Sequence, residues 1–395
     1  MTKGSNDGLL AGITVLDMSQ FLAGPMAALR LGDLGARVIK VERPDGGDLC
    51  RRLYLSDTEI GGDSTLFHAI NRGKESFAVN MKDEGDLQDL RVLIAKADVI
   101  IQNFRPGVID RLGLDYASVA KINPRIVYGS ITGYGADNEW RHFPGQDLLA
   151  QARSGAMWLN GEADDGPVPF GLAVADMLAG NLIVQGILAG LVRRGVTGQG
   201  VHVETSLLEA MIDFQFEVLT THLNDGGRLP KKSSVRNAHA YLAAPYGVYH
   251  CADGWLALAM MPLSKLAPLF ELPALAEFTP HEAFTRRDRI KSLIASRLHE
   301  KTVKEWLAIL EPADIWAAEV LDWPKLLQTA AFRQLDMLQT VTRSDGVSVR
   351  TTASPIRVDG IRSKNGSAAP TIGSESEKIR AEFIPPSPPR GEGRG

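Results

Sequence analysis

The sequence predicts an α/β fold built on a parallel sheet, and two observations support this. Short, almost continuously apolar runs rich in β-branched residues alternate with helical stretches through the first half of the chain. Strands that are apolar on both faces are typical of a parallel sheet covered by helices on both sides. The length of 395 residues favours two domains, or one large domain with an insertion, at roughly 100–200 residues per domain.

The elements of this first half follow one another in a regular order. Strands are predicted at Ile13–Leu16, Val38–Val41, Asp98–Ile101 and Ile126–Ser130. The helices between them are predicted at Pro25–Leu34, Asp83–Lys96 and Tyr116–Lys121. Pro25 suits a first helical turn because its missing N–H would be unpaired there. Gly35 suits the end of that helix because glycine adopts the left-handed conformation easily.

The second half changes character after a polar stretch of linker composition, Asn224–Ser234. Before it, helices are predicted at Asp147–Ala156, Val174–Arg194 and Thr205–Leu223. After it come strands at Tyr246–His250 and Trp255–Met260, helices at Pro280–Leu298 and Val303–Leu310, and strands at Leu338–Thr342 and Ser348–Val358. This order predicts a smaller α+β unit inside the chain.

We therefore expect the chain to be divided into five segments. Residues 1–205 form the first part of a large domain, 206–224 a linker helix, 225–318 the small domain and 319–384 the return to the large domain. Residues 385–395, rich in proline and glycine, are expected to be a disordered tail.

The composition excludes several classes of protein. The formal net charge of −4 gives no overall attraction to nucleic acid or to an anionic membrane. Two cysteines without CxxC spacing exclude a disulfide framework and a thiolate zinc site, and the histidines show no metal-binding spacing. The N-terminal residues lack the apolar core of a signal peptide, so we expect a cytoplasmic protein. The apolar stretch Ala173–Val192 contains Asp176, Asn181 and Gln185, which favours a buried helix over a membrane span.

Basic residues follow successive predicted strands, where a parallel sheet binds its ligands. They are Arg43, Arg51 and Arg52 after the second strand, Arg105 and Arg111 after the third, and Lys74 and Lys82 between these two groups. Each of these residues alone is more typical of a solvated charged surface. Their clustering at strand ends indicates a site for a phosphate-bearing ligand as well as it indicates such a surface. The loop after the first strand lacks GxGxxG, so a dinucleotide site is not favoured, and the chain has no GxSxG elbow of a serine hydrolase.

Asp176 is the most unusual residue of the sequence. It lies in an apolar helix start, FGLAVADMLAG, where an unpaired carboxylate is costly to bury. Two interpretations remain open from the residues alone: a reactive group, or a helix-terminal residue stabilised by the helix dipole.

Several long segments resemble the family III CoA-transferases, which include formyl-CoA transferase, carnitine CoA-transferase and 2-methylacyl-CoA racemase. The segments are Leu16–Asp48, Asn71–Lys82, Ala97–Tyr116, Asn123–Gly135 and Gly145–Met157, followed by VADMLAG and RRGVTGQGVHVETSLLEAM. The resemblance implies a large Rossmann-like domain made from both chain ends, a small α+β domain, and a homodimer whose two ring-like chains are interlocked.

The resemblance also implies that Asp176 is the catalytic nucleophile. With a reference pKa of about 3.9, an aspartate is ionised at pH 7 and needs no separate base. Its attack on an acyl-CoA would give a mixed anhydride and then an aspartyl-CoA thioester, both of which must be shielded from water.

The CoA-contacting positions of the family fall on the same strand-end loops. They correspond to Leu22, Ala23, Arg43, the run from Val79 to Lys82, Asn103, Phe104, Arg105 and Arg111. Arg43, Lys82, Arg105 and Arg111 are then candidates to bind the phosphates, and Phe104 to face the adenine. Leu22 stands where formyl-CoA transferase has glutamine, which disfavours a formate/oxalate reaction.

Two further positions depart from the relatives. Gln146 stands where the racemase has histidine, and an amide cannot act as an acid or base, although it can contact an oxyanion or substrate. Asn237–Tyr241 replaces the glycine-rich loop of formyl-CoA transferase, so His239 and Tyr241, together with Asp147, are predicted substrate contacts.

The resemblance therefore predicts an enzyme that moves CoA from a small acyl-CoA to a carboxylic acid. Succinyl-CoA is the donor expected by analogy. The alternatives are a 2-methylacyl-CoA racemase, which Gln146 disfavours, and a CoA-binding protein without catalysis. We expect acyl-CoA, a small carboxylic acid and a second copy of the chain as partners, and no metal, nucleic acid or membrane.

Overall fold

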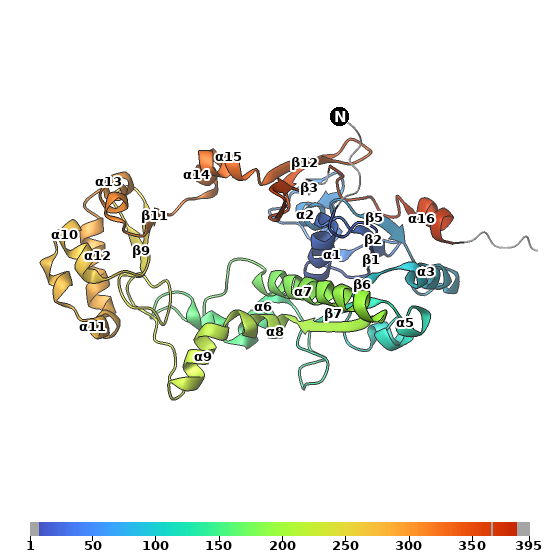
Figure 1. Ribbon diagram of the computed structural model, residues 1–395, viewed down its shortest axis with the longest axis horizontal. Coiled ribbons are helices and arrows are strands. Elements are labelled where there is room, and N and C mark those ends of the chain that lie inside the picture. Colours follow the sequence, from blue (N-terminus) through green and yellow to red (C-terminus); the bar gives the residue numbers. More distant parts are fainter. Residues whose placement is uncertain (1–7, 365, 385–395) are drawn as a thin grey trace, which may run out of the picture. The chain divides into compact units, whose positions relative to one another are not determined.

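The computed structural model describes residues 8–364 and 366–384 and divides into two compact units (Figure 1). The large unit takes the chain up to Ala150, Ala173–Met211 and the segment from Leu335 onward. The small unit takes Gln151–Leu172 and Ile212–Gln334. The chain thus stays in the small unit beyond residue 319, because β11 (Ala317–Glu319) is still paired with a strand of the small sheet. The tail expected at 385–395 lies outside the described residues.

The large unit contains a six-stranded sheet with the order β5-β2-β1-β6-β7-β8. The strands are β1 (Thr14–Asp17), β2 (Arg37–Glu42), β5 (Glu75–Ala78), β6 (Val99–Gln102), β7 (Val127–Thr132) and β8 (Val201–Ser206). Every pairing between neighbours is parallel, which confirms the predicted α/β fold. The order reverses between β1 and β6, the position at which open α/β sheets bind ligands.

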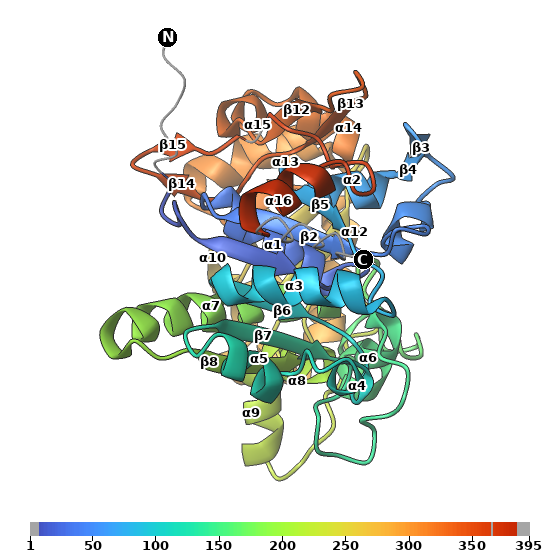
Figure 2. The ribbon, with the colours of Figure 1, turned by 90° about the vertical axis from the view of Figure 1, so that its right-hand side faces the viewer.

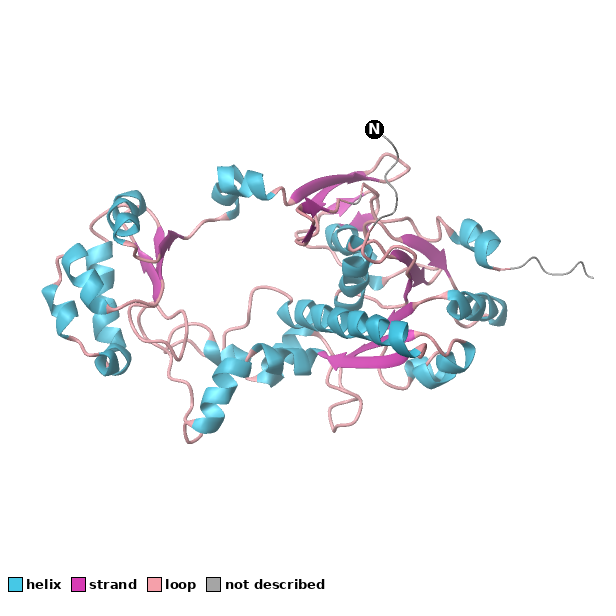
Figure 3. Cartoon of the chain, viewed as in Figure 1, coloured by secondary structure: helices cyan, strands magenta, loops and turns pink. Residues whose placement is uncertain are grey.

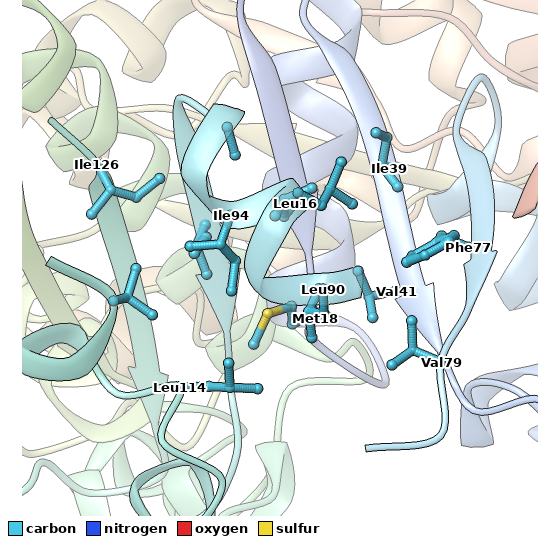
Figure 4. Packing of buried hydrophobic residues seen from close by; sticks show 14 of the residues in the cluster. Leu16, Met18, Ile39, Val41, Phe77, Val79, Leu90, Ile94, Leu114 and Ile126 are labelled. Carbon is cyan, nitrogen blue, oxygen red and sulfur yellow. The ribbon is translucent and has the colours of Figure 1, made fainter. Parts of the chain in front are cut away.

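Helices cover both faces of this sheet (Figure 2). On one face lie α1 (Ala23–Asp33) and α7 (Val174–Thr197), and on the other lie α3 (Glu84–Lys96), α5 (Tyr116–Ile122) and α16 (Ser376–Phe383). Figure 4 shows the core beneath α3, where buried side chains of the sheet, among them Leu16, Ile39 and Phe77, meet Leu90 and Ile94 of the helix. Because α16 adds Ile379 to this core, both ends of the chain build the large unit.

Helix α7 is apolar because it packs on the sheet. Within the described residues it is the helix whose length and composition would suit a membrane span. A Cβ on Gly186 would lie 2.3 Å from Val203 Cγ1, and one on Gly180 would lie 2.7 Å from the Ala23 carbonyl oxygen. This close approach to β8 and α1 accounts for the small and apolar side chains of α7.

Shorter elements complete the large unit. They are the 3₁₀ helix Leu49–Arg52, β3 (Glu59–Ile60), β4 (Asp63–Ser64), α2 (Thr65–Asn71), α4 (Val108–Arg111), α6 (Asp147–Ser154), which runs on into the small unit, α8 (Leu207–Phe214), β12 (Leu338–Thr342), β13 (Ser348–Thr352), β14 (Arg357–Val358) and β15 (Ile361–Arg362).

The small unit combines an antiparallel sheet with a group of helices (Figure 3). The sheet has the order β11-β10-β9, with β9 at Gly247–His250 and β10 at Trp255–Leu258. The helices are α9 (Phe216–Asn224), α10 (Leu263–Leu269), α11 (Pro280–Thr285), α12 (Arg287–Leu298), α13 (Val303–Leu310), α14 (Trp323–Gln328) and α15 (Ala330–Leu335), which ends at the unit boundary, with 3₁₀ turns at Ala156–Leu159, Pro273–Glu277 and Glu311–Ala313. Trp306, Phe270 and Tyr249 are fully buried in its core.

Candidate active site

Asp176 lies in the first turn of α7, where the helix dipole favours a negative charge. Its side chain is only partly accessible to solvent. Among the described residues, no lysine or arginine forms an ion pair with it. The structure therefore combines the two interpretations left open by the sequence: Asp176 is helix-terminal, and its carboxylate is partly buried without a cation among the described residues.

Asp147 begins α6 and caps α7 from a distance. Its Oδ1 accepts hydrogen bonds from the backbone N–H of Ala175 at 2.7 Å and of Asp176 at 3.1 Å. The residue at the N-cap position of α7, Ala173, has no side chain that could do this. Asp147 was predicted as a substrate contact, and the structure gives it this second task of fixing the turn that carries Asp176.

The surroundings raise the pKa of Asp176 to about 7. Burial is the largest cause, the charge of Asp147 raises the pKa further, and the backbone N–H of Ala23 lowers it. The sequence-based expectation of an ordinary aspartate, ionised well below pH 7, is therefore corrected: Asp176 titrates close to neutral pH. The same interaction places Ala23, the first residue of α1, against the Asp176 carboxyl group.

A cavity of about 140 Å³ opens beside the ends of β1, β2 and β6. Five of the predicted CoA-binding residues line it: Arg43, Phe104, and Asn80, Met81 and Lys82 of the predicted run. Arg43 and Lys82 are exposed, and Phe104 packs partly against the core. The described lining of this cavity does not include Asp176, but it does include Gln20, three residues before Ala23.

The other predicted CoA-binding residues lie around this cavity in different settings. Arg105 and Arg111 are exposed outside the lining of the cavity. Leu22 packs partly against a small core cluster, and Ala23 is buried. Val79 is fully buried in the main core (Figure 4), so only its backbone is left to meet a ligand.

Two of the basic residues that follow the strands form ion pairs inside the protein. Arg51 is buried and forms ion pairs with Glu42 at 2.7 Å and Asp63 at 3.0 Å. Lys74 is buried against Asp17 at 2.7 Å. These two side chains therefore have structural roles. The candidates to bind phosphate are the exposed side chains Arg43, Lys82, Arg105 and Arg111.

Sequence reasoning missed several residues that line the cavity. They are Met18, Ser19, Gln20, Lys40, Val41, Glu42, Gly47 and Asp48. All lie in or beside the same strand-end loops, so the position of those loops is the signal that would have found them. Asp48 has a clear function there, because its carboxylate pairs with the buried Lys40 at 2.7 Å and accepts the N–H of Phe21 at 3.2 Å.

Gln146 is exposed and lies immediately before α6, next to Asp147.

His239 and Tyr241 belong to the small unit, and the Tyr241 N–H donates to His239 Nδ1 at 3.2 Å. Tyr241 lines two cavities of that unit, of about 820 and 640 Å³. Contact of these residues with a substrate stays a prediction. In the part of the chain that the structure describes, no group of three or more His, Cys, Asp or Glu side chains could hold a metal.

The order of the motifs along the chain matches one known family. A family model described as CoA-transferase family III matches residues 10–376. The chain belongs to CoA-transferase family III. The resemblance read from the sequence is thus confirmed, and the protein is an enzyme of the CoA-transferase class, whose members use acyl-CoA as a substrate.

Relatives within family III are similar along almost the whole chain. The protein is 32% identical to an acetyl-CoA:oxalate CoA-transferase of Acetobacter aceti, over 97% of both chains. It is 29% identical to a succinyl-CoA:glutarate CoA-transferase of Mus musculus, over 95% of this chain and 86% of the other. A crystal structure of a CAIB/BAIF family protein from Brucella suis superposes with a TM-score of 0.83 at 30% identity, covering 95% and 99% of the two chains.

Proposed function

We propose that this family III enzyme transfers CoA from a small acyl-CoA to a carboxylic acid, with Asp176 as the nucleophile. The observation that carries the proposal is the setting of Asp176. Its carboxyl group is partly buried without a cation, lies at the start of two helices, and has a pKa raised to about 7. Perturbed carboxyl groups of this kind are typical of reactive sites.

The names of two relatives support the substrate class. Both transfer CoA from a short acyl-CoA, acetyl-CoA or succinyl-CoA, and both are named for a dicarboxylic acid, oxalate or glutarate. We therefore take succinyl-CoA as the first donor to test and small dicarboxylic acids as acceptors. Leu22 in place of glutamine disfavours oxalate, so glutarate is the acceptor tested first.

The first half of the reaction uses the ionised form of Asp176. One carboxylate oxygen attacks the thioester carbonyl carbon, the C–S bond breaks, and CoA leaves as a thiolate while an aspartyl-acyl anhydride forms. The thiolate then attacks the aspartyl carbonyl carbon of the anhydride. The C–O bond to the acyl group breaks, the donor acid leaves as a carboxylate, and an aspartyl-CoA thioester remains.

The second half repeats these steps with the acceptor. Its carboxylate attacks the aspartyl thioester and releases CoA thiolate, which attacks the acceptor's carbonyl carbon in the new anhydride. The products are the new acyl-CoA and free Asp176, and no proton or water is consumed. We propose that the backbone N–H of Ala23, the first residue of α1, stabilises the negative oxygen that develops in each addition.

The CoA moiety is proposed to lie over the strand-end loops. Arg43 and Lys82 meet its phosphates and Phe104 faces its adenine, because these three residues line the same cavity. Gln146 cannot carry a proton at neutral pH, so we propose that the enzyme does not exchange the α-proton of its substrate.

Intact-mass spectrometry with succinyl-CoA alone tests this proposal. We expect a mass increase equal to CoA less one water on the wild-type chain, mapped to the peptide with Asp176 and removed by hydroxylamine. Asp176→Asn should show no adduct and should lose at least about 10³-fold in transfer to glutarate. Glu84→Gln is the matched control, since Glu84 also occupies a first helical turn of the large unit. Wild-type activity in Asp176→Asn would rule the mechanism out.

We also propose a homodimer in the cytoplasm. The exposed apolar side chains Met177, Val192 and Val196 on α7 support a contact with another protein. Light scattering coupled to gel filtration gives the mass in solution, and a monomer at micromolar concentration would contradict the dimer.

A further inference from the structure

Both polar atoms of the Asn103 side chain, Oδ1 and Nδ2, bind the backbone of one residue in a neighbouring loop. Its Oδ1 accepts the backbone N–H of Gln20 at 2.8 Å, and its Nδ2 donates to the Gln20 carbonyl oxygen at 2.7 Å. The side chain thus pairs with Gln20 much as an adjacent strand would. The resemblance had made Asn103 a CoA contact, and this pairing gives it a different task.

The paired residues bridge the point at which the strand order reverses. Asn103 directly follows β6, and Gln20 lies in the loop between β1 and α1. The backbone pairing of β1 with β6 ends just before, where the Met18 N–H donates to the Ile101 carbonyl oxygen at 2.9 Å. Beyond this point the hydrogen bonds between Asn103 and Gln20 connect the loop that follows β6 to the loop that follows β1.

The loop that Asn103 holds needs such support. Phe21 has a φ of 64° and is not a glycine, a conformation that costs roughly 1–2 kcal/mol. Its side chain is 46% exposed, so packing holds it less firmly than a core residue. The hydrogen bonds on either side of it therefore carry the conformation: Asn103 on Gln20, and Asp48 on the Phe21 N–H.

The same loop leads directly to the reactive carboxylate. Gln20 and Phe21 are followed by Leu22, and Ala23 begins α1 with its N–H against Asp176. A shift of Gln20 would move that N–H relative to the Asp176 carboxyl group. The residues on either side of Asn103 are also fixed. Gln102 Oε1 accepts the Phe104 N–H at 2.8 Å, and Gln102 Nε2 donates to Ser130 Oγ at 3.0 Å.

We infer that Asn103 is a positioning residue that fixes the loop Ser19–Ala23 and thereby the donor groups at Asp176. The inference rests on the proposed function, in which Asp176 reacts. It assigns to Asn103 an effect on the rate of the covalent steps and not on the affinity for CoA.

Asn103→Ala and Asn103→Asp test this inference, with Asn123→Ala as the matched control. Asn123 is also an asparagine that binds backbone, donating to Ile94 and Ala97 and accepting from Arg125. It precedes β7, at the other end of the strands. Asn103→Asp keeps the acceptor for the Gln20 N–H but places a carboxylate against the Gln20 carbonyl oxygen.

The first readout is hydrogen exchange of the substrate-free protein. Peptides covering residues 18–26 should exchange faster in both Asn103 variants than in the wild type, and should be unchanged in Asn123→Ala. This measurement requires no activity. Unchanged exchange in Asn103→Ala overturns the inference, whatever reaction the protein catalyses.

The second readout separates rate from binding. Asn103→Ala should lower kcat for transfer roughly 10- to 100-fold, because small misplacements of a reacting group have effects of that size. The Kd for CoA, measured by calorimetry, should change less than about threefold. A raised Kd with unchanged kcat makes Asn103 a CoA ligand and overturns the inference, as does an equal loss of kcat in Asn123→Ala. A wild-type protein that forms no adduct and transfers no CoA refutes the proposed function, and with it the catalytic effect of Asn103. The hydrogen-exchange data then still decide whether Asn103 orders the loop.

Discussion

Two buried aspartates of the large unit, Asp17 and Asp176, have opposite acid–base behaviour. Asp17 ends β1 and is fully buried, with Lys74 Nζ at 2.7 Å and Lys40 Nζ at 3.8 Å from its Oδ2. Burial alone would raise its pKa, but the two lysines lower it below the ordinary value. Asp176 has no such cation among the described residues, and its pKa is raised.

The contrast separates a structural carboxylate from a reactive one. A buried charge that is paired on all sides has its lone pairs engaged and contributes to the fixed structure. A buried charge stabilised only by backbone N–H groups keeps an oxygen available for attack and titrates near neutral pH. The environment of each carboxylate, rather than its residue type, therefore decides its chemistry.

The largest expected effect comes from neutralising the paired carboxylate. Asp17→Asn leaves the buried Lys74 without its carboxylate partner, while Lys40 keeps Asp48. It should lower the free energy of unfolding by about 3–5 kcal/mol. Urea unfolding at pH 7 measures it. Glu84→Gln, which breaks an exposed ion pair with Arg91, should cost less than about 1 kcal/mol. Equal losses in the two variants would contradict the structural role of Asp17.

Neutralising the reactive carboxylate should have the opposite sign. The folded-state pKa of Asp176, about 7, lies above the reference value of 3.8. Ionised Asp176 therefore destabilises the fold fully above pH 7, and this cost declines as the pH falls from about 7 towards 3.8, below which it is absent. Asp176→Asn should stabilise the protein by about 1–3 kcal/mol at pH 8 and by much less at pH 5. Urea unfolding of both proteins at the two pH values measures this difference, and destabilisation at pH 8 would show that the comparison fails.

Lys82 and Lys74 extend the comparison of a reactive-site charge with a structural charge from carboxylates to lysines. Lys82 is exposed beside the cavity, whereas Lys74 is buried and bonded to Asp17, Asn71 and the Pro25 carbonyl oxygen. Lys82→Met should raise KM for acyl-CoA about tenfold, close to 1.4 kcal/mol, without changing unfolding. Steady-state kinetics at low and high salt measure this, and the effect should shrink with salt. Lys74→Met should instead lower the stability, and a KM effect confined to Lys74 would reverse the assignment.

The smallest effect is expected from the charge next to Asp176. Asp147→Asn keeps an oxygen to accept the N–H groups of Ala175 and Asp176 but removes the charge that raises the pKa of Asp176. Since the ionised form attacks, the pH–rate profile should move to lower pH, raising the ratio of the rate at pH 6 to that at pH 8 roughly three- to tenfold. A profile that stays in place would mean that burial alone sets the pKa. Asp147→Ala, which also removes the cap, should additionally cost about 1 kcal/mol of stability.

The sequence predicted the centre of the sheet better than its edges. Strands β1, β2, β6 and β7 were found because both of their faces are buried, which leaves a continuous apolar run. The edge strands β5 and β8 were missed because ESFA is short and mixed, and VHVETS alternates with polar residues on a half-exposed edge. The helix predicted at Thr205–Leu223 is in fact the end of β8 followed by α8 and α9, with an interruption at Gln215.

Helices with strong end signals were predicted closely. Helix α13 begins after Thr302 and ends at Leu310 as expected, with a capping box between Thr302 and Glu305. The predicted helix Pro280–Leu298 divides at Arg286, whose φ of −111° leaves the helical region. A periodic pattern continues across such a break, since both helices face the same core, and the sequence alone does not reveal it.

By itself the sequence determined the parallel α/β fold, the family, and the identity of Asp176, Arg43, Lys82 and Phe104 as candidates, because each of these depends on local pattern and order along the chain. Only the tertiary structure decided that Lys74 and Arg51 are internal, that Asp147 caps α7, and that Asn103 holds Gln20. Their partners lie 9 to 83 residues away along the chain. Hydrogen bonds and ion pairs act over a few ångströms, so the same strand-end residue becomes a ligand contact or an internal brace according to which distant side chain the fold brings beside it.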